Sequence, residues 1–65
     1  MFDPKPGEIY RHDNKGNRTV MVIGWDGISS KIAPAVRCAT YVDGERGPDA
    51  SIWLDVLHNN YTKVG

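Results

Sequence analysis

Hydrophobic and polar positions alternate with a period of two over short stretches of the chain, as expected for half-buried strands. The clearest stretch, residues 18–25, is rich in β-branched residues and nearly continuous in hydrophobicity. In it Val20 and Val22 share one face, opposite Met21 and Ile23. Runs of Gly, Asn, Asp and Pro separate the stretches and indicate turns. The pattern predicts strands at residues 8–12, 18–25, 36–42, 50–53 and 61–64.

The spacing of apolar residues changes near the C-terminus. Trp53, Val56, Leu57 and Tyr61 follow one another at i, i+3, i+4 and i+8, which is a helical spacing. We therefore expect one or two helical turns before the last strand, with Trp53 and Tyr61 closing the core. Residues 43–49 contain no apolar side chain and are expected to form the longest loop.

Four to five short strands separated by turns, with a short C-terminal helical turn, are typical of a small antiparallel barrel. We predict a mainly β fold of this kind, organised as one domain over residues 1–65. Two prolines among residues 1–6 predict an extended N-terminal arm.

The composition favours binding over catalysis. A chain of 65 residues buries a small core, which rarely supplies more than about 3–5 kcal/mol of net stability. Each unsatisfied buried polar group would cost about 1–3 kcal/mol, so a buried catalytic cluster is hard to support. We expect no enzyme activity and no cofactor. Eight basic and eight acidic residues balance each other, so the sequence shows no overall basic character.

Few residues offer metal or nucleophile chemistry. Cys38 is the only cysteine, so neither an internal disulfide nor a cysteine-based zinc site is expected. It lies in an apolar run, where a free cysteine usually packs as a small hydrophobe. His12 and His58 are the usual acid–base candidates, and we expect both to face solvent without a metal. No targeting segment or membrane-length apolar run is present, so we expect a cytoplasmic protein and no membrane partner.

Three segments together resemble a group of small phage and prophage proteins. They are KPGEIYRH at residues 5–12, RTVMVI at residues 18–23 and WLxxLxxxYTKV at residues 53–64. The resemblance spans nearly the whole chain and implies an SH3-like barrel. It also implies an accessory role, such as binding and modulating a host defence or regulatory protein.

A second resemblance is to the MazF/PemK toxin endoribonucleases, which are also SH3-like. GEIY at residues 7–10 is similar to their first strand, and residues 17–23 place Arg18 at the catalytic arginine. Residues 34–40 loosely follow the next strand, with Thr40 near the catalytic Ser or Thr. Thr19 stands where that family has proline. The resemblance implies RNA cleavage if Arg18 and Thr40 converge in a cleft.

Aromatic residues are numerous for so small a domain, and aromatic side chains dominate protein interfaces. Trp25, next to a predicted turn, is the first candidate for an exposed anchor. The leading hypothesis is a module that binds a protein partner, with a homodimer through an edge strand as a compatible form. Its candidate contact residues are Trp25, Tyr41, Tyr10 and Arg37.

The alternative hypothesis is a nucleic-acid-binding domain. It requires basic side chains that gather on one face of the fold, since phosphate contacts supply most of the affinity. The candidate residues are Arg11, Lys15, Arg18, Lys31 and Arg37.

Overall fold

A long antiparallel pair of strands forms the centre of the fold. In the computed structural model, which describes residues 2–26 and 34–65, β2 (Arg18–Asp26) pairs with β3 (Ala35–Val42) over nearly its full length. Both strands are rich in β-branched residues, which suit a pleated surface that is buried on one side. The other elements are β1 (Ile9–His12), β4 (Glu45–Arg46), β5 (Ala50–Trp53), α1 (Leu54–Asn60) and β6 (Tyr61–Lys63).

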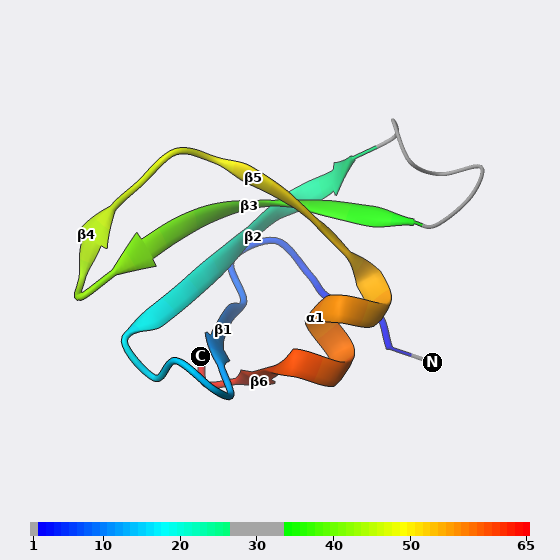
Figure 1. Ribbon diagram of the computed structural model, residues 1–65. Helices are drawn as coiled ribbons and strands as arrows, with labels where there is room; N and C mark the ends of the chain where they lie inside the picture. Colours follow the sequence, from blue (N-terminus) through cyan, green and yellow to red (C-terminus); the bar gives the residue numbers. More distant parts are fainter. Residues whose placement is uncertain (1, 27–33) are drawn as a thin grey trace.

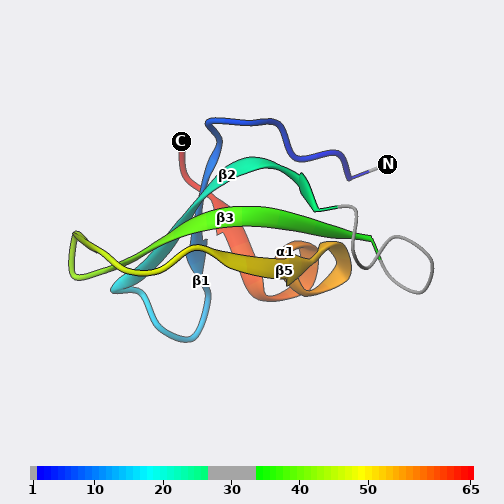
Figure 2. The same cartoon turned by 90° about the horizontal axis from the view of Figure 1, so that it is seen from above.

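All strand pairs are antiparallel, and the strand order is β4-β3-β2-β1-β6, with β5 also pairing β3. The helix lies between β5 and β6, where the curled sheet stays open (Figure 1). Figure 2 shows β2, β3 and β5 side by side, with α1 beyond them. The predicted mainly β fold of antiparallel strands with a short C-terminal helix is confirmed, and the strands form a curled open sheet. The described residues contain six strands rather than four to five, because the short β4 is separate from β5.

One face of the sheet, here termed the inner face, carries the core. The buried cluster consists of Tyr10, Val20, Val22, Val36, Cys38 and Leu57. Cys38 is fully buried, which confirms the prediction from its apolar run. Among the described residues no polar or charged side chain is buried, so the small core contains no polar cluster that would need internal partners.

The pairing of β2 with β3 is irregular at Ile23. Val22 pairs with Cys38, but Gly24 pairs with Arg37, so Ile23 is an extra residue on β2. Such a bulge shifts the alternation of the following residues by one. Trp25 therefore pairs with Val36 and is aligned with the inner face, at the far end of the strand.

A tight turn at Asp43 and Gly44 joins β3 to β4. Both residues have positive φ, 53° and 81°, which is the signature of a type I′ two-residue hairpin. Asp-Gly is a preferred sequence for this turn because glycine adopts positive φ without steric cost. The segment expected to be one long loop therefore contains a hairpin, and β4 brings Arg46 opposite Tyr41.

The N-terminal arm packs on the domain. Pro4 is buried, and the Phe2 ring lies 5.9 Å from the Tyr10 ring and 4.7 Å from the His58 ring. Gly7 continues the arm into the sheet by donating its backbone N–H to the carbonyl of Val22 over 2.8 Å. The arm thus covers one side of the core beside α1.

Candidate functional site

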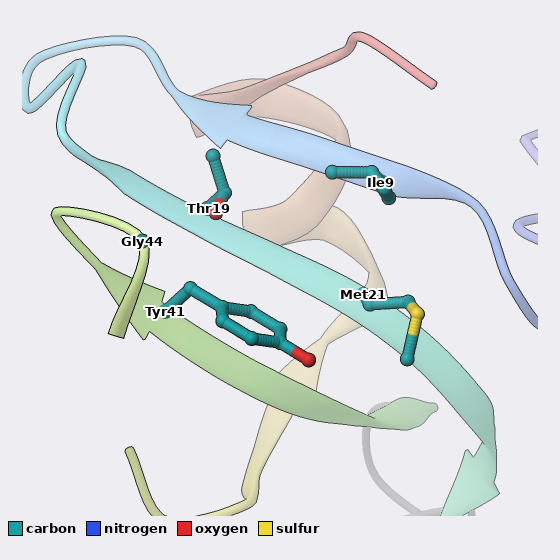
Figure 3. A pocket seen from close by; sticks show the side chains of 5 residues that line it. All are labelled: Ile9, Thr19, Met21, Tyr41 and Gly44. Atoms are coloured by element: carbon teal, nitrogen blue, oxygen red, sulfur yellow. The ribbon is translucent and has the colours of Figure 1, made fainter. Parts of the chain in front are cut away.

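The face of the sheet that points away from the core, here termed the outer face, carries an apolar hollow. Its volume is about 220 Å³, and it is lined by Ile9, Thr19, Met21, Tyr41 and Gly44; we call it the outer hollow (Figure 3). Strand pairing produces it, because Ile9 lies opposite Met21 and Thr19 lies opposite Tyr41. Figure 3 shows the Tyr41 ring lying along the sheet with its hydroxyl directed toward Met21.

Arginines flank this hollow. Arg11 pairs with Thr19, and Thr19 with Tyr41, which pairs in turn with Arg46, so one cross-strand row places an arginine on each side of the Tyr41 ring. Asp49 makes the largest contribution to a raised pKa of Arg46, and Tyr41 raises this pKa further. The Arg46 guanidinium is therefore close to the Tyr41 phenol. Within the described part of the chain, Arg11 has no ion-pair partner.

Arg37 lies on the same outer face, two rows farther along β3. It contacts Asp49 at 3.8 Å, while Arg46 contacts the other oxygen of Asp49 at 2.9 Å. One carboxylate therefore serves both arginines. Because Arg11 adds a third cation, the surroundings of the outer hollow favour a negatively charged partner.

The predicted partner-contact residues do not form one surface. Tyr41 and Arg37 lie on the outer face, as just described. Trp25 is 57% exposed, as predicted, but its position after the bulge separates it from the outer hollow. Tyr10 is only 4% exposed, and its hydroxyl donates a hydrogen bond to Glu8 Oε1 over 3.0 Å. The Tyr10 ring therefore belongs to the core and offers little surface to a partner.

Trp53 also differs from its prediction. It was expected to close the core together with Tyr61, but it is 53% exposed. Tyr61 is partly buried and packs against the core cluster, as expected. Trp53 is the N-cap of α1 with extended backbone angles, φ −62° and ψ 142°, so it belongs to β5 rather than to the helical face.

The predicted nucleic-acid residues are divided between two faces. Arg11 and Arg37 share the outer face. Arg18 alternates with Val20 and so belongs to the inner face, while Lys15 lies in the turn before β2. Lys31 lies outside the described residues. Their distribution does not produce the single basic face that this hypothesis needs.

A second hollow, also of about 220 Å³, lies where the inner face extends beyond the core. Arg18, Val20, Thr40, Val42 and Tyr61 line it, together with parts of Thr19 and Tyr41; we call it the mouth hollow. Arg18 and Thr40 thus share one cavity, as the ribonuclease hypothesis requires. The Thr40 hydroxyl, however, donates a 2.7 Å hydrogen bond to the carbonyl of Pro48.

The remaining chemical candidates, His12, His58 and Cys38, do not line either hollow. His12 contacts the Tyr61 ring, and His58 contacts Phe2, so the two histidines have different neighbours. Burial raises the pKa of Cys38 to about 11, which leaves its thiol protonated at neutral pH. Across the described ranges, no three metal-ligating side chains form a cluster.

Sequence reasoning missed five residues of the outer site: Ile9, Thr19, Met21, Gly44 and Arg46. The alternation of β2 already placed Met21 opposite the core face, but only pairing to β1 and β3 brings Ile9 and Tyr41 beside it. The Asp-Gly turn was the signal that could have placed Arg46 across from Tyr41.

No protein-family model matches the chain, and comparisons with curated proteins and with solved structures also found no match. Both family resemblances therefore stay hypotheses. No helix in the described residues is long and apolar enough to cross a membrane.

Proposed function

We propose that this protein is a non-catalytic binding module whose partner is another protein, held on the outer face. The outer hollow is the observation that carries the proposal. Apolar side chains line a concavity on a solvent-facing surface. A partner that covers them would remove this apolar area from water, which favours binding. Apolar lining suits a protein side chain better than a phosphate backbone.

The occupant is an acidic segment that carries a large apolar side chain. The apolar group enters the outer hollow beside Tyr41, and carboxylates on either side meet Arg11 and Arg46. Charge complementarity supports this choice, since Asp49 is the only carboxylate with an ion pair to either Arg37 or Arg46 in the described structure. The role expected from the phage resemblance, modulation of a host protein in the cytoplasm, belongs to the same proposal.

A displayed peptide library tests the partner chemistry without knowledge of the host. Selected peptides are expected to combine Asp or Glu with a central Leu, Phe or Trp. Binding of a selected peptide should weaken at least about tenfold in Tyr41→Ala, as for a central interface aromatic. Arg11→Gln should reduce the salt dependence of binding, because its exposed charge is screened by salt.

Two controls complete the design. Tyr41→Phe keeps the ring and should bind like the parent protein, and Arg18→Gln alters only the inner face. Selection of basic peptides, or equal binding by the Tyr41→Ala variant in its folded state, would contradict the proposal. If instead labelled single-stranded RNA or DNA binds and the affinity falls steeply with salt, the nucleic-acid alternative replaces it.

A further inference from the structure

The inner face continues one row beyond the core. Val20 is buried, but the next pair on that face, Arg18 and Val42, is exposed. The mouth hollow forms there, between the end of the β2–β3 pair and Tyr61. It differs from the outer hollow in having a cation within its lining.

Arg18 is the cation in the lining of the mouth hollow. Among the described residues its side chain makes no hydrogen bond and no ion pair, although its backbone N–H donates to the carbonyl of Lys15 over 2.9 Å. A guanidinium presents a planar fork of N–H donors that matches the two oxygens of a carboxylate or phosphate. The charge in this lining therefore favours an oxyanion.

Tyr61 supplies a second donor. Burial raises the pKa of Tyr61, so its hydroxyl stays protonated at neutral pH. Arg18 lowers the same pKa, and both side chains line the mouth hollow. Because the Thr40 hydroxyl donates to Pro48, it can only accept, so Arg18 and Tyr61 are the donor side chains that the inner face offers a ligand.

Val20 and Val42 add apolar surface to the lining. The hollow of about 220 Å³ exceeds the cavity of roughly 150 Å³ that is known to hold benzene. We propose that the mouth hollow binds a small molecule in which a carboxylate or phosphate group is attached to an apolar body of about benzene size. This inference does not rest on the protein-binding proposal, because its cation and its apolar residues, Arg18, Val20 and Val42, do not line the outer hollow, although Thr19 and Tyr41 line both.

Glu45 provides an internal check on the electrostatics. It pairs with Val42, which pairs with Arg18, so the three residues form one row across β4, β3 and β2. Two strand spacings separate the Glu45 and Arg18 backbones by about 10 Å. The carboxylate should therefore repel an anion in the hollow moderately, and its removal should improve binding.

Titration of the ¹⁵N-labelled full chain by NMR tests the proposal. The probes are benzoate, phenyl phosphate and the neutral analogue benzamide, all at millimolar concentrations. We expect saturable shifts at the amides of Arg18, Val42 and Tyr61 with one or both anions, and none with benzamide. A response to benzoate alone identifies a carboxylate ligand, and a response to phenyl phosphate alone identifies a phosphate ligand.

Variants separate this site from general charge effects. Arg18→Gln should weaken binding at least about tenfold, as expected for loss of a charge-assisted hydrogen-bond pair. Arg11→Gln on the outer face should leave the affinity unchanged, and Glu45→Gln should raise it. Because Arg18 is exposed and its side chain contacts no partner within residues 2–26 and 34–65, its replacement should preserve the fold, which the spectrum itself reports. Absence of saturable shifts, equal shifts with benzamide, or unchanged binding in Arg18→Gln would overturn the proposal.

Discussion

Leu57 is the fully buried side chain by which α1 packs against the sheet, and its truncation should remove most of the stability. It is the only residue of the seven-residue helix that is buried, and its exposure is 0%. A helix this short is not stable by itself, since isolated helices below about 12 residues are marginal in water. Its position therefore depends on packing against the core, where Leu57 is the one fully buried side chain of the helix and Leu54 adds a partly buried one.

The expected cost follows from burial. Leu57→Ala removes three carbon atoms from a fully buried site, which costs about 2.4 kcal/mol in transfer free energy alone. The cavity left behind brings the usual total to about 2–5 kcal/mol. A core of this size rarely supplies more than about 3–5 kcal/mol of net stability. We therefore expect Leu57→Ala to be largely unfolded at room temperature.

Urea denaturation followed by far-ultraviolet circular dichroism measures the effect. Tryptophan fluorescence is a poorer probe, because Trp25 and Trp53 are both more than half exposed in the folded state. The matched control is Val56→Ala, which alters the neighbouring helix residue at 36% exposure and should cost less than about 1 kcal/mol. Leu57→Met keeps the volume and should remain folded, at a cost below about 1.5 kcal/mol.

Equal losses in Leu57→Ala and Val56→Ala would refute the reasoning. So would a fully stable Leu57→Ala, because the helix would then be held by contacts other than the buried leucine.

Two further predictions concern the backbone and the ionisation of the core. Gly44→Ala should destabilise the protein by about 1–2 kcal/mol, because φ is +81° there, whereas Gly16→Ala, at a glycine without positive φ, should cost less in the same denaturation assay. Burial, followed by the hydrogen bond to Glu8, raises the pKa of Tyr10 to about 12, so folding favours the protonated phenol. The contribution of this protonated phenol to the free energy of unfolding is complete below pH 10 and is lost as the pH rises to about 12. In urea unfolding at several pH values, Tyr10→Phe should therefore lose less stability across that window than the parent protein does.

The strands were predictable because their determinants are local. Period-two alternation and the β-branched composition of residues 18–25 gave β2, and turn residues separated it from β1. The helix between β5 and β6 was visible for the same reason. The face on which Trp25 lies was harder to predict from the sequence. A single extra residue at Ile23 moves Trp25 to the other face, and no local pattern marked the bulge.

The helical spacing that predicted α1 also produced its main error. Counting from Trp53 to Tyr61 treats both aromatics as helix residues, but α1 comprises only Leu54–Asn60. Trp53 ends β5 and Tyr61 begins β6, so the position of each side chain follows the strand it belongs to. A helical spacing of apolar residues is therefore informative only within the helix. The first and last residues of the helix must be assigned before its buried and exposed faces can be predicted.

Candidate sites depend on pairings between distant segments, and this is why the sequence revealed their members but not their grouping. Tyr41, Arg11 and Arg18 were all selected as candidates from residue type. Register then separates them: Arg11 joins Tyr41 on the outer face through Thr19, whereas Arg18 lies opposite Val42 on the inner face. A one-residue change of register would exchange these faces. The two proposed binding sites are thus consequences of the β1–β2–β3 pairing, and variants at Arg11 and Arg18 should have separable effects.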